Sequence, residues 1–231
     1  MSALIFDIES AGDLLSECDD TTKKLINEKV NPKNEKDIDV NETMGLSPYT
    51  GKIVVIGTLD SEIDRGAVYY LNPEGVKDDS ETKGIIYRAY STEKELLNKF
   101  WEIADKYSTF VTYNGRMFDI PYILIRSAIH NVKPTKDLMR GRYLYQQSPK
   151  AIHIDLYDQL AFYGSFRFKT GGSLHMACKA FSIKSPKDGG IDGSMVTTMF
   201  NDKKYQEIAK YNSRDLWATK SLYEKWQKYL A

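Results

Sequence analysis

Residues 3–10 read A-L-I-F-D-I-E-S, and they decide how the rest of the chain is interpreted. Their first half is a short apolar run, which is typical of a strand buried at the centre of a sheet. Asp7 and Glu9 follow with one residue between them, so in a strand their side chains point to the same face, about 6–7 Å apart. Two such carboxylates repel each other unless a cation lies between them, and hard divalent cations prefer carboxylate oxygens. The alternative is a strand that simply ends in polar residues at the surface.

The composition is that of an ordinary globular protein. The chain has 231 residues, of which 42% are hydrophobic and 28% are charged, and it contains no internal repeat and no linker. We therefore expect a single domain spanning residues 1–231. The formal net charge of +0 excludes nucleic-acid binding through bulk basicity, so any such surface must be local.

Cysteine usage and the start of the chain indicate a location. Cys18 and Cys178 are far apart and lack metal-ligand spacing, which favours a reducing compartment. No apolar run is long enough to cross a membrane, and a first strand at residue 3 leaves no room for a targeting peptide. We expect a cytoplasmic protein without a membrane partner.

Apolar segments predict three more strands, at residues 52–59, 67–71 and 84–90. Their connections are short, which favours antiparallel pairing. Residues 11–48, by contrast, are polar and broken by glycine and proline, and acidic residues outnumber lysines there. This stretch is predicted to be an insertion, either a gate over a substrate channel or a loop without a role.

The second half of the chain alternates helices and strands. A capping box of Thr92 and Glu95 begins a predicted helix. The remaining pattern predicts helices at residues 92–107, 118–130, 173–181 and 203–230, and strands at residues 109–113 and 152–156. Together these elements predict an α/β fold, with a mixed central β-sheet flanked by α-helices.

Three later positions carry side chains that a metal site would use. Asp119 opens the helix that follows the strand at residues 109–113. Tyr211 and Asp215 are four residues apart on the last predicted helix, so they share one face. Each has a structural explanation on its own: Asp119 could stabilise a helix N-terminus, Asp215 could pair with a neighbouring basic residue, and Tyr211 could be a core aromatic.

Taken together, the motifs D-x-E, N-x-x-x-F-D and Y-x-x-x-D resemble the three exonuclease motifs of the DEDDy-type 3′–5′ exonucleases, within the ribonuclease H-like (DnaQ-like) superfamily. The sequence is particularly similar to the proofreading exonuclease domain of family B DNA polymerases, in stand-alone form. The segment Y-N-G-R-M-F-D-I-P-Y-I at residues 113–123 is near that group's second motif over its whole length. The resemblance covers residues 3 to about 223 and implies a ribonuclease H-like fold.

The resemblance implies catalytic roles. Asp7 would bridge two metal ions, and Glu9 and Asp215 would complete the ligands of the first. Asp119 would hold the second ion through water. Tyr211 would position the attacking water by hydrogen bonding, because a tyrosine with a pKa near 10 is a poor base at neutral pH.

The same resemblance implies substrate contacts. Asn114 and Phe118 would hold the terminal nucleotides. Ser10 stands where the family usually has threonine, so the hydroxyl is kept and the methyl is lost. Separately from the resemblance, Arg116, Arg140 and Arg142 are candidates for phosphate contacts on loops.

Four carboxylates form an all-oxygen set of ligands, which suits two divalent ions, Mg²⁺ or Mn²⁺, better than Zn²⁺. The expected reaction is hydrolysis of single-stranded or frayed DNA from its 3′ end, releasing 5′-mononucleotides. RNA is the alternative substrate, and a catalytically inactive nucleic-acid-binding module is the alternative of another class. A complete set of carboxylates argues against the inactive module. The stand-alone form leaves room for a non-covalent replication or repair partner.

Two other groups of residues have a structural and a functional interpretation. F-Y-G-S-F-R-F-K at residues 162–169 interleaves aromatic and basic side chains, which suits either base stacking or a core strand with solvated charges. His130, His153 and His175 are expected to be structural, with His130 capping a helix C-terminus.

Overall fold

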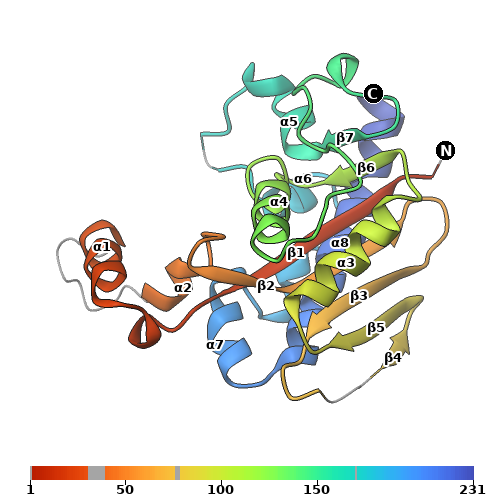
Figure 1. Ribbon diagram of the computed structural model, residues 1–231. Coiled ribbons are helices and arrows are strands. Elements are labelled where there is room, and N and C mark those ends of the chain that lie inside the picture. Colours follow the sequence, from red (N-terminus) through yellow and green to blue (C-terminus); the bar gives the residue numbers. More distant parts are fainter. Residues whose placement is uncertain (1, 31–39, 76–78, 170) are drawn as a thin grey trace.

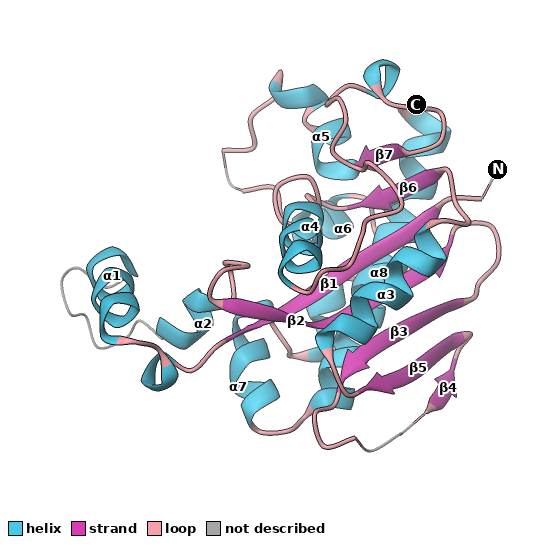
Figure 2. Ribbon diagram, in the orientation of Figure 1, coloured by secondary structure: helices cyan, strands magenta, loops and turns pink. Residues whose placement is uncertain are grey.

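A computed structural model of the chain describes residues 2–30, 40–75, 79–169 and 171–231. Within them, seven strands form one mixed sheet in the order β4-β5-β3-β2-β1-β6-β7. Helices cover both faces: α3 and α4 lie in front of the sheet in the view of Figure 1, and α8 lies behind it. Figure 2 shows the same arrangement by type of element. The predicted architecture, a mixed central sheet flanked by helices, is confirmed.

The first strand lies at the centre of the sheet. β1 (Leu4–Gly12) pairs antiparallel with β2 (Gly51–Asp60) on one side and parallel with β6 (Thr109–Thr112) on the other. β3 (Gly66–Leu71) extends the sheet antiparallel to β2, and β7 (Ile152–Asp155) extends it parallel to β6. The apolar run that precedes Asp7 is therefore buried between neighbours on both sides, as the sequence predicts.

The outer pair of strands departs from the prediction. The sequence favours an antiparallel pair here, but β5 (Ile85–Tyr90) runs parallel to β3. The reason is an unpredicted strand, β4 (Ser80–Thr82), at the edge of the sheet. The chain forms β4 outside β5 and reverses through Lys83 and Gly84, which both have positive φ. β4 has three residues, S-E-T, and so carries no apolar pattern to recognise.

The predicted helices are present with small differences at their ends. The capping box is confirmed, since the Thr92 hydroxyl accepts from the Glu95 N–H at 3.3 Å and the Glu95 carboxylate accepts from the Thr92 N–H at 2.9 Å. The α-helices that follow are α3 (Glu93–Ala104), α4 (Asp119–Ile129), α5 (Leu156–Leu160), α6 (Leu174–Ala180), α7 (Val196–Asn201) and α8 (Tyr205–Tyr229). Short 3₁₀ turns join them at η2 (Leu144–Gln146), η3 (Phe162–Gly164), η4 (Pro186–Gly189) and η5 (Gly193–Met195).

Helix α8 packs across β1, β2 and β3. Its buried side chains include Ile208, Tyr211, Leu216, Ala218, Leu222 and Trp226. This packing brings the third motif, near the end of the sequence, against the strand that carries the first.

The polar insertion is a helical arm that is closed at its base. β1 continues through Gly12, so the insertion begins at Asp13, two residues later than predicted, and the Asp13 N–H donates to the Thr50 carbonyl at 2.9 Å. The arm contains η1 (Leu15–Glu17), α1 (Asp20–Val30) and α2 (Val40–Met44), and it stands away from the sheet on the left of Figure 1. Residues 31–39 lie outside the described residues, so the gate stays a prediction.

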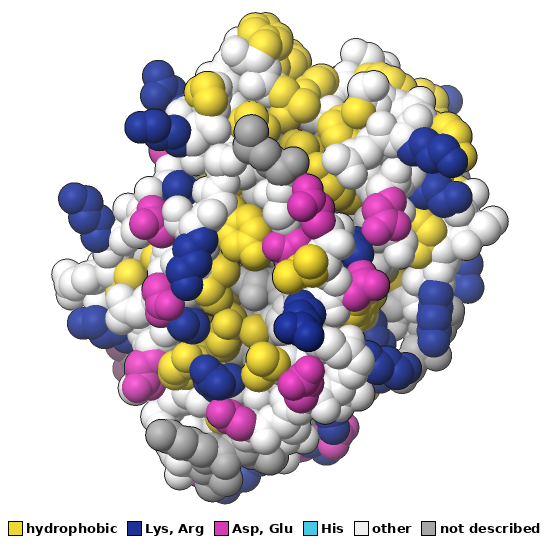
Figure 3. Space-filling model, turned by 90° about the vertical axis from the view of Figure 1, so that its right-hand side faces the viewer, with side chains coloured by type: hydrophobic (Ala, Val, Ile, Leu, Met, Phe, Trp, Pro, Cys, Tyr) yellow, Lys and Arg dark blue, Asp and Glu magenta, His cyan; other side chains and the backbone are white. Residues whose placement is uncertain are grey.

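The surface carries charges of both signs. On the face that lies to the right in Figure 1, basic, acidic and hydrophobic side chains are interspersed (Figure 3). Of the helices that the structure describes, none has both the length and the apolar character to cross a membrane.

A buried ion pair ties together the helices on the front face. The Glu93 carboxylate accepts from Arg126 at 2.6 Å and 2.9 Å, from the Ile53 N–H at 2.8 Å, and is 2.8 Å from His130 Nε2. The sequence predicts that the His130 side chain caps carbonyl groups at the helix C-terminus. Its imidazole instead contacts the Glu93 carboxylate, because α3 places that carboxylate within reach.

Removing Glu93 is expected to destabilise the fold strongly. Glu93→Ala leaves a largely buried guanidinium and a buried N–H of β2 without their acceptor, which typically costs about 3–5 kcal/mol. Urea unfolding measures this loss. The control is Glu102→Ala on the same helix, whose partner Lys99 lies at the surface and whose loss should be small. Equal effects of the two substitutions would contradict a structural role for the buried pair.

Candidate active site

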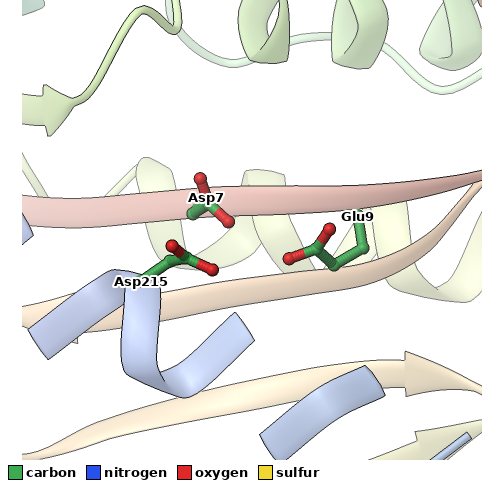
Figure 4. Close-up of side chains that lie close together, drawn as sticks. All are labelled: Asp7, Glu9 and Asp215. Atoms are coloured by element: carbon green, nitrogen blue, oxygen red, sulfur yellow. The ribbon is translucent and has the colours of Figure 1, made fainter. Parts of the chain in front are cut away.

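Three carboxylates converge where β1 meets α8. Asp7 and Glu9 project from β1 toward the helix, and Asp215 reaches them from α8 (Figure 4). Each of the three offers an oxygen, and these oxygens lie within 4.8 Å of one another. Glu9 and Asp215 are each only 8% exposed, so water screens their charges poorly. The shared face predicted for the D-x-E sequence is therefore observed.

Asp119 joins the cluster through the backbone of β1. β6 ends at Thr112, so among the described strands none pairs with β1 on that side beyond Ile5. The Asp119 carboxylate, at the start of α4, fills the gap by accepting the Ile8 N–H at 3.1 Å. Its oxygens are not among the three that converge, but its charge acts on Asp7.

Burial and mutual repulsion shift the acidity of all four groups. Burial raises the pKa of Asp7, and the charges of Asp119 and Asp215 raise it further. Burial also raises the pKa of Glu9, with a further rise from Asp215. Burial raises the pKa of Asp119 and of Asp215 to about 7. Four carboxylates, three of them buried and Asp7 half-buried, form an all-oxygen set that fits hard divalent cations such as Mg²⁺ or Mn²⁺, which would neutralise this repulsion.

These shifts predict how the metal-free fold responds to pH. Carboxyls with a pKa near 4 in the unfolded chain and of about 7 in the fold, as for Asp119 and Asp215, bind more protons when folded. Their stabilising contribution is therefore complete below the unfolded pKa and is lost as pH rises toward the folded value. Urea unfolding in chelator should show this loss between about pH 4, the pKa in the unfolded chain, and about pH 7, the pKa in the fold.

The matched comparison is Asp215→Asn, which removes one of the two titrating groups and should flatten the profile. Adding Mg²⁺ or Mn²⁺ to the wild-type protein at the upper pH should restore stability. If the difference between wild type and Asp215→Asn does not change across this range, the carboxylates do not repel as described.

Tyr211 lies beside these carboxylates, one helical turn before Asp215. Its side chain is 7% exposed, and its hydroxyl lowers the pKa of Asp215, against the burial that raises the pKa of that carboxyl. Burial and the nearby charge of Glu9 raise the pKa of Tyr211 far above its ordinary value. The phenol is therefore neutral at physiological pH and is available as a hydrogen-bond donor.

Asn212 is a site residue that the sequence analysis missed. Its Nδ2 donates to Asp7 Oδ2 at 2.7 Å and lies 3.4 Å from Glu9 Oε1, so one amide holds both β1 carboxylates. The fully buried amide fits because β2 has glycine opposite it: a Cβ at Gly57 would lie 1.9 Å from Asn212 Oδ1. A glycine inside a buried strand was the available signal, since it marks a close approach.

Asp155 is a second residue that the analysis missed. Its two oxygens accept the backbone N–H groups of Asn114 at 2.7 Å and Arg116 at 3.0 Å, and so fix the turn of the second motif. Asn114 adopts a positive φ of 63°, and a Cβ on Gly115 would lie 2.4 Å from the Thr112 hydroxyl. The turn therefore needs a residue that tolerates positive φ at position 114 and a residue without a side chain at position 115.

His153 is neutral and structural. Burial, together with the charge of Arg116, lowers the pKa of His153 to about 3. Its Nε2 lies 2.8 Å from the Thr112 hydroxyl. The expected structural role of this histidine is supported, with a hydroxyl and not a carboxylate as its partner.

The four expected substrate contacts surround the cluster without joining it. Ser10 lies at a bulge in β1 and donates its hydroxyl to Gly45 in the arm at 2.7 Å. The Phe118 ring packs against the Tyr122 ring, with 5.3 Å between the ring centroids. The Arg116 guanidinium donates to the Met139 carbonyl at 3.0 Å. Within the described residues, none of these side chains, nor that of Asn114, hydrogen-bonds to the carboxylates. Arg142 is held by Asp158 in a two-point pair, at 2.6 Å and 3.0 Å.

A family model and individual sequence relatives both relate this chain to DNA polymerases. A family model described as "Predicted 3'-5' exonuclease related to the exonuclease domain of PolB" matches residues 74–230, more than half of the chain. DNA polymerase 1 of Sulfurisphaera ohwakuensis is 27% identical over 161 residues, which are 64% of this chain and 17% of that protein. DNA polymerase 1 of Sulfolobus acidocaldarius is 36% identical over 94 residues, 39% of this chain and 10% of that protein.

The fold also resembles a solved structure. The family B DNA polymerase from the hyperthermophilic archaeon Pyrobaculum calidifontis matches with a TM-score of 0.62 and 18% identity. The match covers 98% of this chain and 24% of that one. The predicted ribonuclease H-like fold is confirmed, and the chain corresponds to a minor part of the length of the polymerases it matches.

Proposed function

Because this chain belongs to the family of predicted 3′–5′ exonucleases related to the exonuclease domain of PolB, we propose that it is a metal-dependent 3′–5′ exonuclease of the DEDDy type. It removes 5′-mononucleotides from single-stranded or frayed DNA. The observation that carries the proposal is the convergence of Asp7, Glu9 and Asp215 within 4.8 Å, with Asp119 and Tyr211 beside them. We further propose that residues 1–231 act as one exonuclease domain with the arm as an insertion.

The proposed metal ligands are Asp7, Glu9, Asp119 and Asp215, and two ions, Mg²⁺ or Mn²⁺, suit their oxygens. When bound, such ions make water more acidic and stabilise the charge that develops on a phosphate. The chain's own groups prepare the site. The Asn212 amide holds Asp7 and Glu9 in place, and the hydrogen bond of Asp119 to the Ile8 N–H fixes that carboxylate to β1.

Tyr211 has the protonation state that a water-positioning group needs. A phenol whose pKa lies far above neutral keeps its proton, so it orients water and does not deprotonate it. The substrate contacts remain those implied by the second motif: Asn114, Arg116 and Phe118, with Ser10 at the bulge beside Glu9.

DNA is proposed as the substrate because the matched relatives are DNA polymerases. RNA is the alternative, since the metal chemistry is shared. An inactive nucleic-acid-binding module is disfavoured by the complete set of carboxylates. We also propose a non-covalent replication or repair partner, because the matched relatives are DNA polymerases.

Digestion of end-labelled oligonucleotides tests the function. Matched single-stranded DNA and RNA, each free or blocked at its 3′ or 5′ end, are incubated with Mg²⁺, Mn²⁺ or chelator. We expect mononucleotide release from unblocked 3′ ends, faster on DNA, and none in chelator. Release from 3′-blocked substrates, or faster digestion of RNA, would contradict the proposed polarity or substrate. If no substrate is cut with either ion, the inactive module is the better description.

A further inference from the structure

A cavity of about 770 Å³ lies on the side of α8 that faces away from the carboxylates. Its walls come from the β4–β5 hairpin, from residues 183–186 and from α8, where Lys210, Arg214 and Trp217 line it. None of Asp7, Glu9, Asp119 and Asp215 lines it. Its volume falls within the range of about 300–1,000 Å³ that is typical of small-molecule sites. The cavity is therefore separate from the proposed catalytic site and large enough for a nucleotide.

The walls carry a local excess of positive charge. Lys83, Lys184, Lys210 and Arg214 come from three different segments, and within the described chain none of their side chains forms a hydrogen bond or an ion pair, although the charge of Arg214 also acts on Asp215. The one carboxylate in the wall, Asp64, is already paired with Lys220. In a protein of zero net charge, four unpaired cations around one cavity favour an anionic ligand.

Arg214 strengthens this preference. It is only partly exposed, and its Nη1 is buried without a hydrogen-bond partner in the described structure. A guanidinium that is poorly solvated is weakly screened, so its field extends further into the cavity than that of a fully hydrated lysine. An anion that pairs with such a guanidinium gains more binding free energy than one that pairs with a hydrated cation at an open surface.

The rest of the wall suits the flat, apolar part of a nucleotide. Tyr87 and Trp217 line the cavity, with Ile85 and Ile183 beside them. The Tyr87 hydroxyl donates to Ser213 at 3.0 Å, and Ser213 donates to the Lys210 carbonyl at 2.8 Å, so this side of the wall is fixed. Aromatic side chains beside cations form the combination that binds bases and phosphates together.

We propose that this cavity binds a nucleotide phosphate ester, outside the catalytic site. Two sources share that chemistry: a free 5′-mononucleotide, or a stretch of single strand held away from the carboxylates. The proposal needs no metal ion and no hydrolysis, so it can stand or fail independently of the exonuclease activity.

The test is equilibrium binding in chelator, where metal-dependent cleavage is suppressed. Calorimetric titrations use a nucleoside 5′-monophosphate, a short single-stranded DNA and inorganic phosphate as probes. The double variant Lys184→Glu, Lys210→Glu reverses two exposed cations of the cavity. The control Lys94→Glu, Lys225→Glu makes the same change in net charge at exposed lysines outside it. We expect the cavity variant to bind about tenfold or more weakly and the control to match wild type.

The probes separate the two sources. Tight binding of the monophosphate identifies a free nucleotide, whereas binding of the oligonucleotide alone, with a steep salt dependence, identifies a strand. The proposal is overturned if inorganic phosphate binds as tightly as either nucleotide probe, if neither nucleotide probe binds at millimolar concentration, or if both variants bind like wild type.

A second measurement uses only the wild-type protein, so its result does not depend on whether the variants fold. Chemical acylation of lysines in the wild-type protein, mapped by mass spectrometry, should be slowed at Lys184 and Lys210 by the bound probe and unchanged at Lys94 and Lys225. Equal protection at all four lysines would place the ligand elsewhere.

Discussion

Asp7→Asn is expected to lower exonuclease activity by more than about a hundredfold, because even partners that only orient metal ligands cost roughly 10–100-fold when they are lost. Asp7 interacts with every other carboxylate of the site: the charges of Asp119, Asp215 and Glu9 all raise its pKa, and Asn212 donates to it. The substitution keeps the shape of the side chain and removes one of the converging charges. We therefore expect weaker metal binding and a folded protein.

Three measurements check this expectation together. Nuclease assays give the loss of rate, calorimetric titration with Mn²⁺ gives the loss of metal affinity, and urea unfolding in chelator gives stability. Metal-free Asp7→Asn should be at least as stable as wild type, because it removes a repelling buried carboxylate. The control is Asp202→Asn, whose exposed carboxylate pairs with Lys204 far from the cluster. Activity above a tenth of wild type in Asp7→Asn would rule out its proposed position between two ions.

Local patterns predicted most elements, because they reflect geometry within one segment. The alternation of a strand placed Asp7 and Glu9 on one face, and the spacing of a helix placed Tyr211 beside Asp215. The capping box at Thr92 involves residues three apart and was equally readable. In each case the interacting groups are close in the sequence, so local backbone geometry alone fixes their relative positions.

Features that depend on distant partners were not predictable in the same way. The parallel pairing of β5 with β3 follows from a three-residue edge strand with no apolar pattern. Asn212 reads as one polar residue in a helix until packing brings it to Asp7, 205 positions earlier. Ser10 departs from simple alternation because a bulge between Glu9 and Ser10 shifts the register. These features come from how elements meet, which a single sequence does not encode locally.

Tyr211→Phe is expected to slow the reaction without weakening metal binding. The hydroxyl lowers the pKa of Asp215 and is not one of the converging carboxylate oxygens. Losing one positioned hydrogen-bond donor typically reduces the rate roughly tenfold to a thousandfold. The ring remains, so the packing of α8 on the sheet should be preserved, and metal affinity should stay close to wild type.

The matched control is Tyr223→Phe, which removes another buried hydroxyl from the same helix, one that accepts a hydrogen bond from Gln227 at 2.9 Å, far from the carboxylates. Both variants lose a phenol hydroxyl from α8, so a structural effect on the helix would appear in both, whereas an effect on the attacking water would appear only in Tyr211→Phe. Calorimetric titration with Mn²⁺ separates the remaining alternatives. If Tyr211→Phe lost metal affinity in proportion to its rate, the hydroxyl would act through Asp215 as a metal-site residue, and the role of positioning water would have to be given up.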